Sequence, residues 1–93
     1  MITSTTRHTA RRMIDPAQLR AARGLVRWSQ RELAEQSGVH INTIKDFERE
    51  AAPNPTRATL LAWQRALSKA GVAFIDGDDQ QGPGVRLREP RTD

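Results

Sequence analysis

The sequence predicts a mainly α-helical fold in which four helices are followed by a C-terminal β-hairpin. Apolar residues recur at spacings of three and four between Leu19 and Leu67, which is typical of helices with one buried face. Asp15, Ser29 and Thr56 precede helical stretches as residues suited to capping a helix N-terminus, and His40 is a weaker cap for the third helix. After Gly71 the pattern changes to two short β-like segments on either side of a polar, glycine-rich loop.

The composition limits the possible functions. A chain of 93 residues is long enough for one domain with one core. Cysteine is absent and the only histidines, His8 and His40, stand in different contexts, which argues against disulfides and metal sites. No nucleophile–base pair or phosphate-binding glycine loop is recognisable, so we expect no catalytic residues, no metal, no cofactor and no enzymatic activity. No apolar run approaches the ~18 residues of a membrane helix, and the N-terminus lacks a secretory signal, so we expect a cytoplasmic protein without a membrane partner.

Positive charge is concentrated in the part of the chain that we expect to fold and in its N-terminal arm. Residues 1–75 contain twelve Lys and Arg against six Asp and Glu, whereas residues 76–93 contain three against five. A basic surface favours a polyanionic partner, although a soluble domain that is merely rich in arginine has the same composition.

Residues 1–14 carry Thr, Ser and Arg without an apolar period, and we interpret them as a disordered basic arm. The predicted helical domain spans residues 15–71. Its first helix begins at Asp15-Pro16, with Asp15 as the cap, Pro16 at the first helical position and Gln18 completing a capping box. The buried face of this helix is predicted to hold Leu19, Ala22, Leu25 and Val26.

The second helix begins after Ser29, which forms a capping box with Glu32, while Trp28 and Leu33 have the spacing of a hydrophobic staple. It ends at Gly38, a residue that adopts the left-handed conformation without steric penalty.

The third helix is predicted from His40 to Arg49, with Ile44 and Phe47 on its inner edge. A loop with two prolines follows, and Thr56 then caps the fourth helix. The inward row of the fourth helix is predicted to be Leu60, Trp63, Leu67 and Ala70.

Residues 72–88 are predicted to form the β-hairpin, with strands at 72–75 and 85–88, and residues 89–93 a flexible tail. An isolated two-stranded hairpin is only marginally stable, so its apolar residues must pack on something. We predict that they form a dimer interface together with the fourth helix; the alternative is that the hairpin folds back over its own bundle. The predicted interface residues are Leu61, Val72, Phe74, Ile75, Val85 and Leu87.

Residues 29–48 are the most informative part of the sequence. Two short helices joined by a glycine turn leave the second of them on the outside of the domain. Its outer faces carry small polar and hydrogen-bonding groups of the kind that contact base edges in DNA. These outer residues are His40, Ile41, Asn42, Thr43, Lys45, Asp46 and Arg49.

The spacing Gln30, Leu33-Ala34, Gly38-Val39, Ile44 and Glu48 resembles the phage-repressor and Cro-like (Xre-type) helix-turn-helix family. The likeness extends from Leu19 to about Leu67. It implies a lambda-repressor-like helix-turn-helix bundle with its third helix in the DNA major groove. It also implies a sequence-specific transcriptional regulator of double-stranded DNA that acts as a homodimer on a pseudo-palindromic operator.

The resemblance implies base contacts from His40, Ile41, Asn42 and Asp46. Asn42 suits an adenine edge, Asp46 can accept from a cytosine amino group, and Ile41 can touch a thymine methyl group.

The resemblance also implies contacts to the DNA backbone. Gln30, at the start of the second helix, matches a family glutamine that holds a phosphate. Arg23 and Glu48 match a family ion pair, which either directs Arg23 towards the DNA backbone or is purely structural. Thr43, Lys45 and Arg49 complete the predicted backbone contacts.

A second hypothesis is an antitoxin or mobile-element control protein whose C-terminal part binds a partner protein. The acidic C-terminal hairpin is compatible with binding to a partner protein.

Overall fold

The computed structural model describes residues 14–51 and 54–91. It contains α2 (Pro16–Val26), α3 (Gln30–Ser37), α4 (Ile41–Glu48) and α5 (Arg57–Lys69), followed by β1 (Val72–Ile75) and β2 (Gly84–Leu87). The predicted order of four helices and a hairpin is therefore confirmed. The predicted arm, apart from Ile14, lies outside the described residues, as do the last two residues of the predicted tail.

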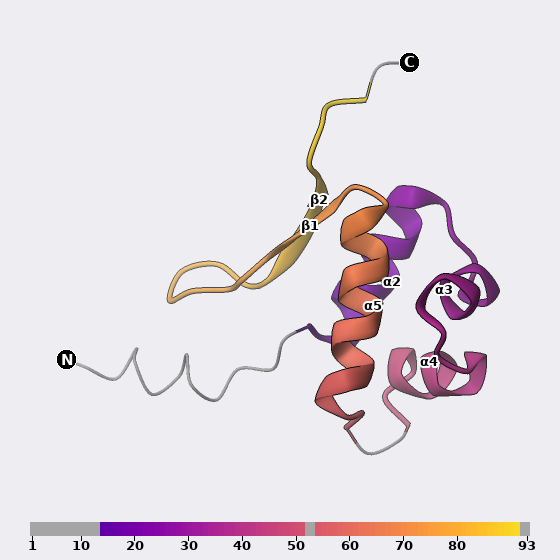
Figure 1. The fold of residues 1–93 in the computed structure, drawn as a ribbon. Coiled ribbons are helices and arrows are strands. Elements are labelled where there is room, and N and C mark those ends of the chain that lie inside the picture. The colour runs from indigo at the N-terminus through magenta and orange to yellow at the C-terminus, as the bar shows by residue number, and fades with distance from the viewer. Residues whose placement is uncertain (1–13, 52–53, 92–93) are drawn as a thin grey trace.

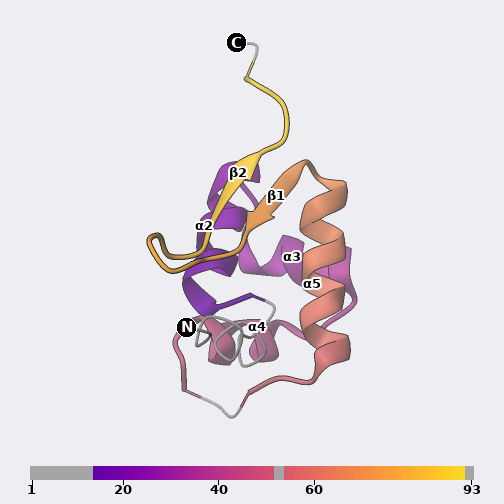
Figure 2. The same ribbon diagram turned by 90° about the vertical axis from the view of Figure 1, so that its left-hand side faces the viewer.

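The helices form a bundle with two distinct sides. In Figures 1 and 2, α2 and α5 lie between the α3–α4 pair on one side and the hairpin on the other. The surface around α3 and α4 is consequently free of the hairpin.

Local capping chemistry places the start of each described helix at, or within one residue of, the position that the sequence predicts. Asp15 and Ser29 each form a complete capping box with the residue three positions later. His40 caps α4 through Nδ1, which accepts the backbone N–H of Asn42 at 3.0 Å. Thr56 accepts the backbone N–H of Thr59 at 3.1 Å and caps α5.

The core joins all four helices to β1. Phe47 and Trp63 pack against each other with ring centroids 5.1 Å apart, which ties α4 to α5. The buried apolar residues are Ile14, Leu19, Ala22, Leu33, Ile44, Phe47, Leu60, Trp63, Leu67 and Val72.

Three predictions about burial are wrong or incomplete. Ile14, assigned to the disordered arm, is fully buried, so the ordered domain begins before its first helix. Ala70 is exposed because α5 ends at Lys69 and Ala70 is its C-cap. Leu25 and Val26 are only partly buried at the edge of the core, because α2 ends there.

The hairpin covers its own bundle, which was the alternative to a dimer interface. Val72 pairs with Leu87 and Phe74 with Val85. Because directly opposed residues of an antiparallel pair share a face of the sheet, these four residues lie on one side. That side faces the helices, since Val72 is fully buried and Phe74 and Val85 pack against the core.

Two details of the predicted hairpin need correction. Val72 cannot belong to a dimer interface, since its side chain is 0% exposed within the monomer. The second strand begins at Gly84 and ends at Leu87, one residue earlier than predicted.

Gln18 fastens the hairpin to the first turn of α2. Its side chain is buried, and its Oε1 accepts the N–H of Asp15 at 2.9 Å. Its Nε2 donates to the carbonyl oxygens of Ile75 and Gly84, at 3.3 and 3.0 Å. A residue predicted only to complete a helix cap therefore also joins two elements that are distant in sequence.

Candidate nucleic-acid interface

The turn between α3 and α4 presents α4 at the surface. Gly38 ends α3 in the left-handed conformation, with φ of 78°, and its N–H donates to the carbonyl oxygen of Ala34. Ile44 and Phe47 anchor α4 in the core. The helix therefore has a fixed inner face and a solvent-exposed outer face.

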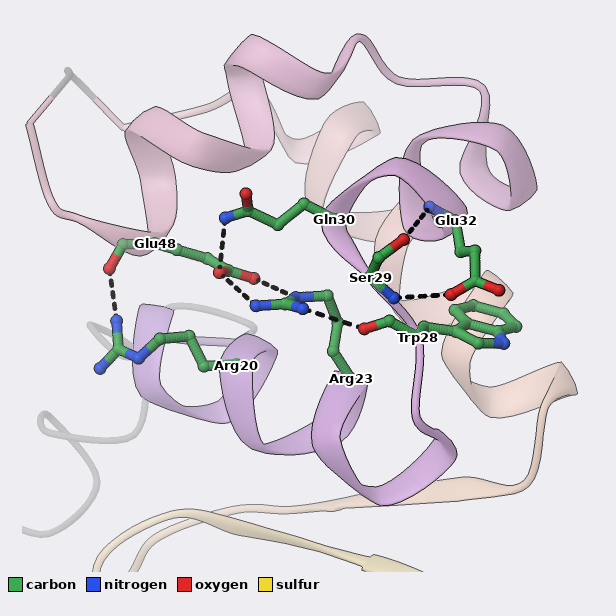
Figure 3. A network of polar contacts seen from close by, with 7 residues as sticks. All are labelled: Arg20, Arg23, Trp28, Ser29, Gln30, Glu32 and Glu48. Atoms are coloured by element: carbon green, nitrogen blue, oxygen red, sulfur yellow. Dashed lines mark hydrogen bonds and ion pairs between the residues drawn. The ribbon is translucent and has the colours of Figure 1, made fainter.

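A buried carboxylate joins α2, α3 and α4 (Figure 3). Glu48 is 5% exposed, and its two carboxylate oxygens accept from one edge of the Arg23 guanidinium, at 2.7 Å for Nε to Oε2 and 2.8 Å for Nη2 to Oε1. Gln30 donates from Nε2 to Oε1 of the same carboxylate at 3.0 Å. Since a buried charge is costly unless it is paired and hydrogen-bonded, these contacts explain how Glu48 is accommodated.

Arg23 lies in this network with its guanidinium directed inward. Its remaining nitrogen, Nη1, donates to the carbonyl oxygen of Trp28 at 2.9 Å. All three guanidinium nitrogens thus have partners inside the protein, and the side chain is 19% exposed. This geometry favours the structural interpretation of the Arg23–Glu48 pair over a contact from Arg23 to the DNA backbone.

Arg20 is a candidate that sequence reasoning missed. It lies one turn before Arg23 on α2, and its Nη1 donates to the backbone carbonyl oxygen of Glu48, at the C-terminal end of α4. The three-residue spacing places both arginines on one side of the helix, and this was the available signal. The ion pair implied between Arg23 and Glu48 places this side of α2 near the end of α4, but it does not indicate that a second arginine contacts the backbone there.

A surface groove of about 680 Å³ runs between these elements. It is lined by Arg20, Gln30, Asn42, Lys45, Asp46, Glu48 and Arg49. Five of the predicted DNA-contacting residues therefore come together here, with Arg20 and Glu48 beside them.

Asp46 and Arg49 form an ion pair at the edge of this groove, with Nη2 2.7 Å from Oδ1. Their side chains are 39% and 68% exposed, so solvent screens the pair. The pairing offsets the negative charge of Asp46 at a surface where a free carboxylate would repel phosphates.

The remaining predicted base contacts lie at the N-terminal end of α4. His40 and Ile41 line a second hollow of about 410 Å³, together with Arg31, Ala34, Glu35, Gly38 and Val39. Because Nδ1 of His40 accepts a hydrogen bond, the neutral ring carries its proton on Nε2 and offers an exposed donor. Thr43 is exposed on α4 and lines neither hollow.

Within residues 14–51 and 54–91, no cluster of three or more His, Asp or Glu side chains is arranged to hold a metal ion. None of the four helices in this part of the chain has the length and apolar character that crossing a membrane requires.

A helix-turn-helix family model matches residues 19–69, more than half of the chain. The match begins in α2, includes every residue of the groove and ends with α5, so the hairpin lies outside it. No curated protein matches the chain.

Proposed function

Because this chain belongs to the Xre-type, lambda-repressor-like helix-turn-helix family of DNA-binding regulators, we propose that it binds a specific double-stranded operator with α4 in the major groove. The observation that carries this proposal is the two-sided character of α4. Its inner side is held by Ile44, Phe47 and Glu48, all buried, whereas Asn42, Thr43 and Lys45 are exposed on its outer side. A rigidly held helix with hydrogen-bonding groups outward is suited to contacting base edges.

In this proposal the first turn of α4 contacts the bases. Asn42 is exposed there, and its carboxamide matches the donor and acceptor of an adenine edge. His40 offers its Nε2–H to a base acceptor, and Ile41 contacts a thymine methyl group. Asp46 accepts from a cytosine amino group while Arg49 holds the carboxylate in place.

Gln30 and the basic residues of α4 contact phosphates. The side chain of Gln30 uses one N–H for Glu48, which leaves the second N–H for a phosphate oxygen. Gln30 is also the first residue of α3, where the helix dipole favours an anion. Thr43, Lys45 and Arg49 extend these backbone contacts along α4.

Two substitutions separate base recognition from positioning. Asn42→Ala should weaken operator binding by roughly 1–3 kcal/mol and relax the preference at one base pair, with little change on non-specific DNA. Gln30→Ala should weaken binding to all sequences about equally. Fluorescence anisotropy on the operator and on random-sequence DNA, after selection of bound sites from a random pool, measures both effects. Identical behaviour of the two variants would show that the orientation of α4 is wrong.

We also propose that the protein binds as a homodimer, with the outward face of the hairpin at the interface. Ala73, Ile75 and Arg86 lie on that face, and Ile75, at 42% exposure, is the exposed large hydrophobic residue of the described part of the chain. The outer edges of a two-stranded sheet also offer unpaired backbone groups to a second copy. A two-fold dimer would contact two half-sites about one helical turn apart.

The dimer is tested by Ile75→Asp and sedimentation. The variant should remain folded, because Ile75 is exposed, but should sediment as a monomer. A wild-type protein that is monomeric at tens of micromolar would contradict the dimer. Ile75 would then be free to contact a different protein, as in the antitoxin-like alternative.

A further inference from the structure

Arg20 occupies a position in the groove that its contact with α4 does not fully explain. One of its guanidinium nitrogens donates to the carbonyl oxygen of Glu48. Its other terminal nitrogen points away from the Glu48 network (Figure 3). The side chain is exposed and lines the same groove as Gln30, Asn42 and Lys45.

The groove has two cations that no carboxylate neutralises. Glu48 is paired with Arg23, and Asp46 is paired with Arg49. Among the described residues, neither Arg20 nor Lys45 has an acidic partner. A positive potential therefore remains in the groove, and it attracts a polyanion.

Arg20 and Gln30 reach Glu48 from opposite sides, one from α2 and the other from α3 (Figure 3). Each retains donors that the protein does not use, and both line the groove. Arginine is well suited to this arrangement, because its fork of donors can hold a backbone carbonyl and a phosphate oxygen together.

We infer that Arg20 is a phosphate-binding residue of the DNA interface, which adds a contact from α2 to those of α3 and α4. This inference rests on the proposed DNA binding. The bond to Glu48 positions the guanidinium at the end of α4, and the free N–H groups bind a phosphate of the DNA backbone. The contact is independent of base sequence.

The test compares the salt dependence of DNA binding in Arg20→Ala and in the wild type. Loss of one phosphate contact should reduce the slope of log affinity against log salt by about 0.9 per protomer. Between 50 and 200 mM salt, the affinity of the variant should therefore fall about 3.5-fold less per protomer than that of the wild type. The loss should be the same on operator and on random DNA.

Three further variants make the result specific to Arg20. Arg20→Lys retains the charge and should keep the wild-type slope. Arg20→Gln retains a polar side chain with hydrogen-bond donors but not the charge, and should show the reduced slope even where Arg20→Ala fails to fold. Arg65→Ala removes an exposed arginine of α5 that lines neither hollow and lies outside the proposed dimer face, and should leave the slope unchanged.

The outcomes are distinguishable. A wild-type protein that binds DNA with salt dependence, together with folded Arg20→Ala or Arg20→Gln variants of unchanged slope, would overturn the role of Arg20 alone. If Arg20→Lys and Arg20→Gln weakened DNA binding equally but kept the wild-type slope, Arg20 would act only by supporting α4. A wild-type slope near zero on every DNA tested would overturn the proposed function itself.

Discussion

Replacing Glu48 by glutamine removes the negative charge at the centre of the α2–α3–α4 network while nearly preserving the size of the side chain. The wild-type carboxylate accepts two hydrogen bonds from Arg23 and one from Gln30. An amide has only one oxygen to accept these bonds, and its NH₂ group then faces other donors. The variant therefore loses the ion pair and gains a donor–donor conflict in a buried site.

The expected loss in the free energy of unfolding follows from how deeply Glu48 and Arg23 are buried. Breaking a fully buried ion pair by removing one partner costs about 3–5 kcal/mol. Glu48 is 5% exposed, but Arg23 is 19% exposed and keeps its bond to the Trp28 carbonyl, so water and the backbone partly compensate. We therefore expect Glu48→Gln to lower the free energy of unfolding by about 2–3 kcal/mol, out of the roughly 5–15 kcal/mol typical of a domain.

Asp46→Asn is the matched control. It makes the same chemical change two residues earlier on the same helix, but it breaks an ion pair whose side chains are 39% and 68% exposed. An exposed pair of this kind contributes about 0.5 kcal/mol or less.

Urea denaturation followed by far-UV circular dichroism measures both variants, provided that the m-values agree. If the two costs fell within about 0.5 kcal/mol of each other, the buried network would not be what fixes α4.

Four further predictions concern other parts of the molecule. Truncation after Gly71 removes the buried Val72 and the partly buried Phe74 and Val85, and should destabilise the bundle by about 4 kcal/mol, seen as a large loss of helical circular dichroism on mild heating. Gln18→Leu should cost about 1–3 kcal/mol in urea denaturation, because three backbone groups lose their partner; a neutral result would mean that Gln18 does not fasten the hairpin. His40→Ala should cost about 1 kcal/mol through loss of the α4 cap, whereas His40→Asn should restore most of it. Backbone N–H groups of Gln80 and Gln81 lower the pKa of Asp78, so these two hydrogen bonds to its carboxylate should be present near neutral pH and weaken as the pH falls through the lowered pKa; amide chemical shifts of Gln80 and Gln81 that do not change on acidification would contradict this.

Local chemistry explains why the helix starts were predictable. The caps at Asp15, Ser29, His40 and Thr56 depend on residues within three positions of one another, so the pattern is visible in the sequence. The family spacing likewise predicted that Gln30, Asn42 and the basic residues of α4 gather on one surface.

Long-range pairing explains what was missed. Arg20 meets the end of α4 across 28 positions of the chain, and Gln18 meets the hairpin across 57 and 66. The apolar residues of the hairpin indicate that it must pack on something, but they do not identify the surface that covers them. Val72 was therefore assigned to a second copy, whereas it completes the core of its own chain.

The fastening of the hairpin to α2 has a consequence for the biogenesis of the protein. The side-chain amide of Gln18 cannot form its bonds to the hairpin until the ribosome has added the carbonyl groups that lie 57 and 66 residues later in the chain. Until then, the side of α2 that packs on β1 and β2 has no cover, and the nascent helices present apolar surface to the surrounding medium. The DNA-binding part of the chain is thus synthesised before the segment that stabilises it, and these distant contacts should make folding slower than in a bundle closed by neighbouring helices alone.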